Sequence, residues 1–165
     1  MLGTLAAATA MAVVLRTQVV GSYVVPSSSM CDTLQVGDRL VAERLSRHAG
    51  LPAVGSIVTL RDPEHPGRTL VKRVVATQGQ VVELRGGKVV VDGLELDEPY
   101  VDQKPTYPAS GEVSYPYVVP QGCVWVMGDN RVASHDSRYF GAVAVRTLEA
   151  RVVAIVWPRE HARHL

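Results

Sequence analysis

The segment Thr69-Leu-Val-Lys-Arg-Val-Val-Ala76 is rich in β-branched residues and is expected to form a strand. Alternate residues of a strand share a face, so Leu70, Lys72 and Val74 are predicted to point to the same side. This places the amine of Lys72 between two aliphatic side chains. The segment therefore predicts both a β fold and a buried lysine within it.

The rest of the chain repeats this pattern of short β-rich runs bounded by Gly, Pro or Asp. Gly86-Gly87 and Asp92-Gly93 have the composition of two-residue hairpin turns. Residues 97–120 are rich in Pro, Tyr and Ser and are expected to form an extended loop with short edge strands. The other expected elements are strands at 38–45, 56–60, 69–76, 80–85, 88–92, 123–127, 141–145 and 150–157, with a turn near 146–149. We therefore predict a mainly β fold, with one compact domain of short antiparallel strands.

Charge and motif content argue against several classes of function. The formal net charge is +1, which gives no indication of a nucleic-acid partner. There is no HExxH motif and no glycine-rich phosphate loop, and the cysteines, Cys31 and Cys123, lack zinc-site spacing. We therefore expect no metal and no other cofactor. The sequence leaves open whether the two cysteines form a disulfide.

The first 22 residues are expected to form one transmembrane helix that anchors the chain. Residues 2–15 are uncharged and apolar, and Arg16 near the helix end can extend its guanidinium to the interface. A buried helix of a soluble domain is one alternative, and a cleavable signal peptide is another, although no basic residue precedes the apolar run. The expected organisation is an anchor at 1–22 and a β domain at 23–165.

The serine cluster Pro26-Ser-Ser-Ser-Met30 follows the expected anchor. By itself it is typical of a loop or a linker. Lys72 changes this interpretation, because burial disfavours an ammonium and lowers the pKa of the amine. A neutral lysine can take the proton of a serine hydroxyl, which is the Ser–Lys form of nucleophilic catalysis. The alternative is an edge lysine whose amine reaches solvent.

The polar segment Gly128–Gly141 lies between two apolar strands and is expected to satisfy its charges within a hydrogen-bonded network. It contains Ser134-His135-Asp136, which spells a catalytic triad in consecutive positions. Triads are assembled in space rather than along the chain, so His135 is disfavoured as a general base.

Taken together, these segments resemble the type I signal peptidase family, serine peptidases that use a Ser–Lys dyad. The resemblance runs from about residue 16 to residue 157. It rests on four segments in the same order as in the family, with a fifth, 97–101, similar to a segment of bacterial members. The four segments are Pro26–Met30 with Thr33-Leu34, Gly37–Val41, Lys72–Val75 leading to Gly79, and Gly128–Gly141.

The resemblance implies that Ser29 is the nucleophile and Lys72 the general base, which then acts as general acid for the leaving amine. The backbone N–H of Ser29 and the hydroxyl of Ser27 would form the oxyanion hole, and Met30 would lie on the substrate side. Ser134 would bind and orient the Lys72 amine. The residues expected to support the site through ion pairs are Asp129, Arg73, Asp136 and Arg138.

The implied function is cleavage of signal peptides from exported preproteins after small residues, in the pattern A-x-A. The partners would be preproteins and the lipid bilayer, with no nucleic acid and no metal. The enzyme would be a single-pass protein of the cytoplasmic (inner or plasma) membrane, with its catalytic domain on the extracytoplasmic side. The alternatives are a related Ser–Lys processing peptidase with a specialised substrate and a catalytically silent membrane scaffold. Asp32 departs from the proline that the family often has there.

Overall fold

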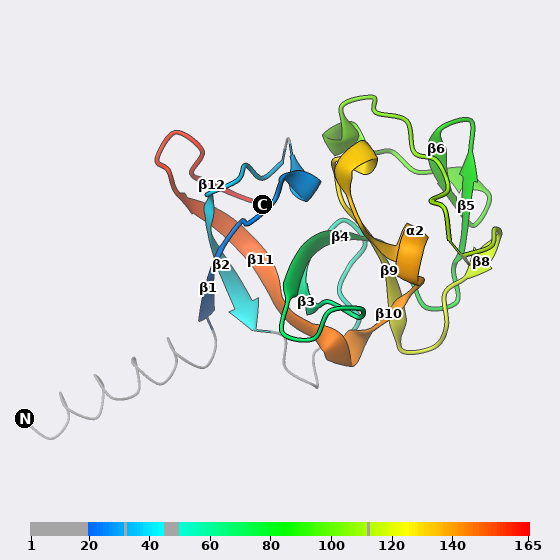
Figure 1. Cartoon of the computed structure of the whole chain (residues 1–165), viewed down its shortest axis with the longest axis horizontal. Coiled ribbons are helices and arrows are strands. Elements are labelled where there is room, and N and C mark those ends of the chain that lie inside the picture. Colours follow the sequence, from blue (N-terminus) through cyan, green and yellow to red (C-terminus); the bar gives the residue numbers. More distant parts are fainter. Residues whose placement is uncertain (1–19, 32, 45–49, 112) are drawn as a thin grey trace, which may run out of the picture.

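A computed structural model describes residues 20–31, 33–44, 50–111 and 113–165, which form two antiparallel β-sheets (Figure 1). The larger sheet has the strand order β1-β2-β11-β3-β4-β9-β10, with β12 paired to β11. Its strands are β1 (Val20–Val24), β2 (Arg39–Arg44), β3 (Ile57–Arg61), β4 (Thr69–Thr77), β9 (Cys123–Met127), β10 (Val143–Ala144), β11 (Leu148–Trp157) and β12 (Arg163–His164). The prediction of a mainly β, antiparallel fold is confirmed.

The smaller sheet has the order β7-β6-β5-β8 and lies beyond β9 (Figure 1). Its strands are β5 (Val81–Arg85), β6 (Lys88–Val91), β7 (Leu94–Glu95) and β8 (Tyr117–Val118). The helical elements are short, namely 3-10 turns η1 (Ser28–Met30), η2 (Pro99–Val101), η3 (Arg131–Ala133) and η4 (Val145–Thr147), and the helix α2 (Ser137–Phe140). The β5–β6 and β6–β7 connections are the two predicted two-residue turns. Gly86 and Gly87 have positive φ in the first, and Asp92 and Gly93 in the second.

Strand β4 lies between β3 and β9, so both of its edges are hydrogen-bonded. Lys72 pairs in register with Val58 of β3. Its same-face neighbours Leu70 and Val74 are buried, as the alternation predicts, and both belong to a cluster that includes Val126 of β9. Burial on both faces of the strand holds Lys72 in a fixed, apolar position.

The structure corrects the sequence-based boundaries at two places. Strand β1 begins at Val20, so the last three residues of the segment assigned to the anchor belong to the sheet. The rest of that segment, residues 1–19, lies outside the described residues, and within the described ranges no helix is long and apolar enough to cross a membrane. The strand expected at 141–145 is limited to Val143–Ala144, because the chain turns through η4 before β11 begins at Leu148.

Candidate active site

The serine cluster forms the short turn η1 at the start of a loop that leaves β1 and returns at β2. The loop is closed at its base by two backbone hydrogen bonds, from Val25 N–H to Asp38 C=O and from Gly37 N–H to Val25 C=O, each 3.0 Å long. Inside the loop, Leu34 N–H donates to Met30 C=O at 2.8 Å. Met30 is buried and fixes the turn in the core, so Ser29 beside it is held in one position.

The amine of Lys72 donates a hydrogen bond to the Ser29 hydroxyl, with 2.8 Å between Nζ and Oγ. The two residues are 43 positions apart in the chain and come from different elements. Both are buried, with 2% of Lys72 and 8% of Ser29 exposed to solvent. The structure therefore brings together the two residues that the sequence singled out.

Burial lowers the pKa of Lys72 from 10.5 to about 8. Desolvation is the main cause, because an ammonium loses its hydration in an apolar surrounding. The carboxylates of Asp136 and Asp129 favour the charged form and oppose part of this effect, while the charge of Arg68 adds to it. At pH 7 about a tenth of Lys72 is therefore a neutral amine, which is the form that can accept a proton from Ser29, and this share rises steeply toward pH 8.

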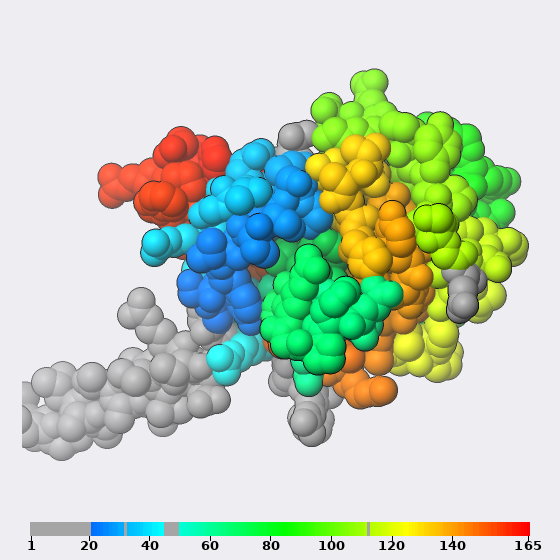
Figure 2. All heavy atoms as spheres, in the orientation of Figure 1, coloured from blue at the N-terminus to red at the C-terminus, as the bar shows by residue number. Residues whose placement is uncertain are grey.

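Ser29 and Lys72 line a cleft of about 170 Å³. One wall is the stretch from Val25 to Met30, and β4 forms the floor with Leu70 and Val71. The opposite wall comes from the β3–β4 loop and from Ala133 and His135. Figure 2 shows this hollow, with the green surface of β4 between the blue N-terminal segment and the yellow segment that follows β9. The pair is thus open to a substrate on one side.

The two serines predicted to assist differ in their placement. Ser27 Oγ donates to Ser29 Oγ at 3.4 Å, so its hydroxyl lies beside the pair. Ser134 is buried, but the predicted hydrogen bond to the Lys72 amine is not formed. The Ser134 hydroxyl instead packs against the backbone of Gly128, where a Cβ would lie 2.2 Å from Ser134 Oγ. Among the described residues it has no hydrogen-bond partner.

Arg73, which follows Lys72 in β4, forms an ion pair with Asp129, and this pair joins β4 to the segment that follows β9. The guanidinium makes two hydrogen bonds to the carboxylate, 2.9 Å from Nε and 2.6 Å from Nη2. Thr33, in the loop that carries Ser29, donates to the same carboxylate at 2.6 Å, and the centre of the Tyr100 ring lies 3.9 Å from the guanidinium carbon. Arg73 and Asp129 therefore connect β4 to the loop that carries Ser29.

A second buried ion pair joins Asp136 and Arg138. Arg138 donates from Nε and Nη2 to the two carboxylate oxygens at 2.9 and 3.0 Å. The carboxylate also accepts the Gly128 N–H at 3.0 Å, and Arg138 Nη2 donates to the Arg131 carbonyl at 2.7 Å. This network fixes the course of the chain from Gly128 to α2, as expected for a charged segment that satisfies its own polar groups.

Two sets of contacts between distant segments were not predicted from the sequence. The Asn130 backbone N–H donates to the Ser29 carbonyl and its side chain donates to the Ser28 carbonyl, both at 3.1 Å. Arg131 forms a buried ion pair with Glu98 and donates to Thr106 at 2.6 Å. Every residue except proline carries a backbone N–H, and no local sequence pattern indicates that the Asn130 N–H binds the Ser29 carbonyl.

His135 does not assemble a triad with its neighbours. Its side chain is exposed, contacts Glu64 of the β3–β4 loop and stacks on Tyr139 at 4.4 Å, while Asp136 is engaged by Arg138. The imidazole and the carboxylate therefore have separate partners, and the Ser134 hydroxyl contacts neither, which agrees with the sequence-based argument against His135 as the base.

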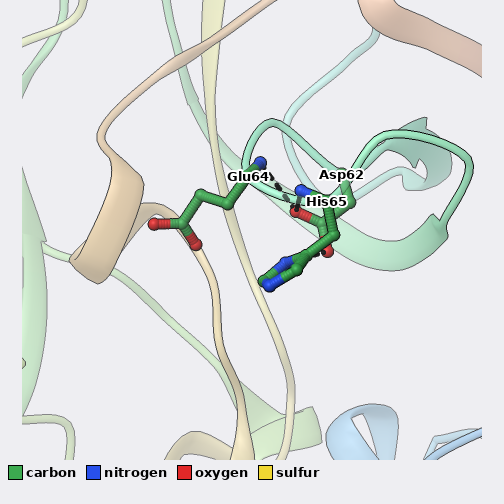
Figure 3. Close-up of side chains that lie close together, drawn as sticks. All are labelled: Asp62, Glu64 and His65. Atoms are coloured by element: carbon green, nitrogen blue, oxygen red, sulfur yellow. Dashed lines mark hydrogen bonds and ion pairs between the residues drawn. The ribbon is translucent and has the colours of Figure 1, made fainter.

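The β3–β4 loop holds a group of potential metal ligands beside the cleft, Asp62, Glu64 and His65, whose ligand atoms lie within 4.8 Å of one another (Figure 3). Asp62 is already engaged. One carboxylate oxygen accepts the N–H groups of Glu64 and His65, and the other faces the His65 ring at 3.3 Å and Arg68 at 3.7 Å. These contacts explain the group as a loop-stabilising cluster around one buried carboxylate.

Replacing Asp136 by alanine is expected to destabilise the domain by about 3–5 kcal/mol, because the Arg138 charge stays buried without its carboxylate. The Gly128 N–H also loses its acceptor. Urea unfolding measures this loss, with the exposed acid Asp97 replaced by alanine as the control. An equal effect of both substitutions would contradict the assignment of Asp136 to a buried network.

Comparison with known proteins agrees with this arrangement. The family described as "Signal peptidase, peptidase S26" matches residues 1–157. A signal peptidase I of Leptolyngbya laminosa is 33% identical over 162 residues, covering 94% of this chain and 77% of that protein. A probable signal peptidase I-1 of Synechocystis is 42% identical over 139 residues, covering 79% of this chain and 68% of that protein. A crystal structure of a signal peptidase I from Enterococcus faecalis matches with a TM-score of 0.54 and 28% identity, over 61% of this chain and 96% of that one.

Proposed function

Because the chain belongs to the signal peptidase family, peptidase S26, and is a serine endopeptidase that cleaves signal peptides, we propose that Ser29 and Lys72 perform the cleavage. The observation that carries the proposal is the 2.8 Å contact between Ser29 Oγ and a buried lysine amine. Geometry and pKa both fit the roles of nucleophile and base.

In the first half of the reaction, Ser29 Oγ attacks the carbonyl carbon of the scissile bond while its proton passes to neutral Lys72 Nζ. The tetrahedral intermediate carries its negative charge on the former carbonyl oxygen. When the C–N bond breaks, the Lys72 ammonium returns the proton to the leaving nitrogen, which becomes the free amine of the mature protein. The signal peptide stays bound to Ser29 as an ester.

In the second half, Lys72 is again neutral and takes a proton from a water molecule that attacks the ester carbonyl. The ester bond breaks and the proton returns to Ser29 Oγ, and the signal peptide leaves as a carboxylic acid that releases its remaining proton to solvent. One amine therefore serves as base and acid in turn, which explains why the site needs a lysine with a lowered pKa rather than a permanent ammonium.

The oxyanion hole is proposed to consist of the Ser29 N–H and the Ser27 hydroxyl. Ser29 lies in the first turn of η1, and N–H groups at the start of a helical turn have no acceptor within it. Ser27 Oγ lies 3.4 Å from Ser29 Oγ, near the atom that would attack the carbonyl. Both donors can therefore face an oxygen bound next to Ser29. Ser134 is proposed to orient Lys72 when its hydroxyl turns from Gly128 toward the amine.

The cleft suits short side chains. Its walls near the pair include Val25, Met30, Leu70 and Val71, and its volume of about 170 Å³ leaves little room beyond the substrate backbone. An extended signal-peptide end is proposed to lie beside a strand of the enzyme, with small residues such as Ala toward these apolar walls. Met30, in the wall of the cleft beside Ser29, would set the limit on side-chain size.

The catalytic domain is proposed to lie on the extracytoplasmic side of the cytoplasmic membrane, held there by one N-terminal span that ends before β1. Exported preproteins present their cleavage sites on that side of the bilayer, so this placement brings the cleft to the substrate. Preproteins and lipid are the proposed partners.

Cleavage of a purified model preprotein with an A-x-A site tests this function. The account expects cleavage after the second Ala and expects at least a tenfold loss when that Ala is replaced by Phe, because the apolar walls leave no space for a ring. The matched control replaces the residue between the two alanines by Phe. Equal cleavage of all three preproteins would contradict a cleft selective for small residues.

The activity is expected to rise with pH through about 8 and then reach a plateau, because Lys72 must be neutral to act and its pKa is about 8. The measurement is kcat/KM for the preprotein between pH 5 and pH 10. Asp136→Asn removes a charge that raises the Lys72 pKa, so its rising limb should move to lower pH. A profile that is flat across this range, or a limb unmoved in the variant, would contradict Lys72 as the base.

A further inference from the structure

We propose that the C-terminal tail, residues 158–165, positions the nucleophile loop through the side chains of His161 and Arg163. The inference rests on the proposed role of Ser29. The family match ends at residue 157, so the tail lies outside the matched region. His161 and Arg163 would thus be positioning residues for the cleavage reaction.

The loop is held both by its own backbone hydrogen bonds and by contacts from other segments. The Val25–Asp38 and Gly37–Val25 hydrogen bonds close its base, and Asn130 binds the turn that carries Ser29. Between them, Leu34 N–H donates to Met30 C=O and Asp38 N–H to Gln35 C=O, whereas the Thr33 carbonyl and the Asp38 carboxylate have partners outside the loop. The tail reaches this part of the loop. In Figure 1 the C-terminal end returns past β11 to the blue segment that contains η1.

The first tail contact is made by His161 to Asp38. This carboxylate is 1% exposed, accepts the Gln35 N–H at 2.9 Å through Oδ2, and lies 2.9 Å from His161 Nδ1 through Oδ1. A buried carboxylate needs partners for both oxygens, and the tail supplies the second partner. His161 thereby helps to keep Asp38 turned toward Gln35, which fixes the end of the loop.

The second tail contact is made by Arg163 to Thr33. The guanidinium donates to the Thr33 carbonyl at 2.5 Å, while the Thr33 hydroxyl donates to Asp129 at 2.6 Å. Thr33 is thus held on one side by the tail and on the other by the residue that pairs with Arg73. Arg163 is thereby linked, through Thr33 and Asp129, to the β4 residue that follows Lys72.

The tail is itself anchored to the sheet and can act as a fixed support. Strand β12 pairs with β11 at Ala154 and Ile155, and Leu165 N–H donates to the Val153 carbonyl at 3.0 Å. Arg163 Nη1 also donates to the His161 carbonyl at 3.3 Å, which couples the two positioning residues. The side chains of His161 and Arg163 therefore reach the loop from a backbone that β11 holds in place.

Loss of these contacts should affect acylation more than substrate binding. A displacement of about 1 Å between a nucleophile and its target costs about 10²-fold in rate, so partial loosening of the loop should cost about tenfold in kcat. The walls formed by β4 and by the β3–β4 loop stay in place, and the Val25–Met30 wall keeps its own backbone hydrogen bonds and its contacts with Asn130, so KM should change less than twofold. A purely structural role would instead lower the melting temperature and leave kcat of the folded protein unchanged.

The experiment compares the full chain carrying His161→Ala and Arg163→Ala with a control carrying Arg159→Ala and His164→Ala. The control removes the same two residue types from exposed positions of the same tail. Preprotein kcat and KM, the rate of Ser29 acylation by a serine-directed inhibitor and the melting temperature are measured for each. We expect about a tenfold lower kcat and acylation rate in the first variant, wild-type values in the control, and partial recovery with His161→Asn and Arg163→Lys.

Several outcomes would overturn the proposal. Wild-type kcat in the first variant would do so, as would an equal loss in the control or a loss confined to the melting temperature. If the double variant does not fold, kcat and the acylation rate are measured for Arg163→Lys and for His161→Asn separately. Wild-type values in both would then overturn the proposal. An unmodified Ser29 in the folded wild-type enzyme would contradict the proposed function itself, so the two failures are distinguishable.

Discussion

Replacing either Ser29 or Lys72 by alanine is expected to lower kcat/KM for a preprotein by about 10⁴-fold or more. Ser29 provides the only proposed acyl acceptor, and Lys72 is the group bonded to its hydroxyl at 2.8 Å. The two losses should not add in the double variant, because nucleophile and base act as one unit. The measurement is kcat/KM of the two single variants and the double variant on one preprotein.

Lys88 provides the matched control for Lys72. It is an exposed lysine in the smaller sheet, paired with Glu95, and its replacement by alanine should leave kcat/KM within about twofold because exposed ion pairs contribute little. Thermal unfolding of all variants separates lost chemistry from lost fold. Wild-type activity in folded Lys72→Ala would mean that another group acts as the base.

The second large effect is expected for Gly128→Ala, which should lower kcat by about 10²-fold. A Cβ at this position would lie 2.4 Å from the Ser29 carbonyl oxygen and 2.2 Å from Ser134 Oγ. The added Cβ would also lie 2.5 Å from Ser134 Cβ, so turning the Ser134 hydroxyl does not relieve the overlap, and the Ser29 carbonyl belongs to the backbone. The nucleophile turn must therefore shift relative to Lys72.

Gly111→Ala is the control for this substitution. Its Cβ would meet the Tyr139 carbonyl at an ordinary 3.7 Å, and its backbone conformation is open to other residues. We expect wild-type kcat in this variant. Wild-type kcat in Gly128→Ala would contradict the close packing of the Ser29 carbonyl on Gly128.

The buried lysine was predictable from the sequence because strand alternation is a local property. Leu70 and Val74 flank Lys72 at the spacing of one face, and the structure buries all three. The hairpin turns were predictable for the same reason, since Gly86-Gly87 and Asp92-Gly93 supply positive φ within two residues. Features that depend on neighbouring residues of one strand or turn were therefore predicted correctly.

The contacts between distant segments were not predictable in the same way. The Ser29 carbonyl meets the Asn130 amide 101 positions later in the chain, and Arg163 meets Thr33 across 130 positions. Such pairs depend on how β11 and β9 place the loops that follow them. The start of β1 at Val20 was missed because the apolar residues of a strand and of a membrane helix share one composition over a few positions.

The most direct test of the central claim is to locate the covalent bond that a serine-directed inhibitor forms with the folded protein, by mass spectrometry of proteolytic fragments. The account predicts a single modification on Ser29, absent in Ser29→Ala and strongly slowed in Lys72→Ala. Modification of another residue, or unchanged labelling of Ser29 without Lys72, would contradict the assignment of this pair as nucleophile and base.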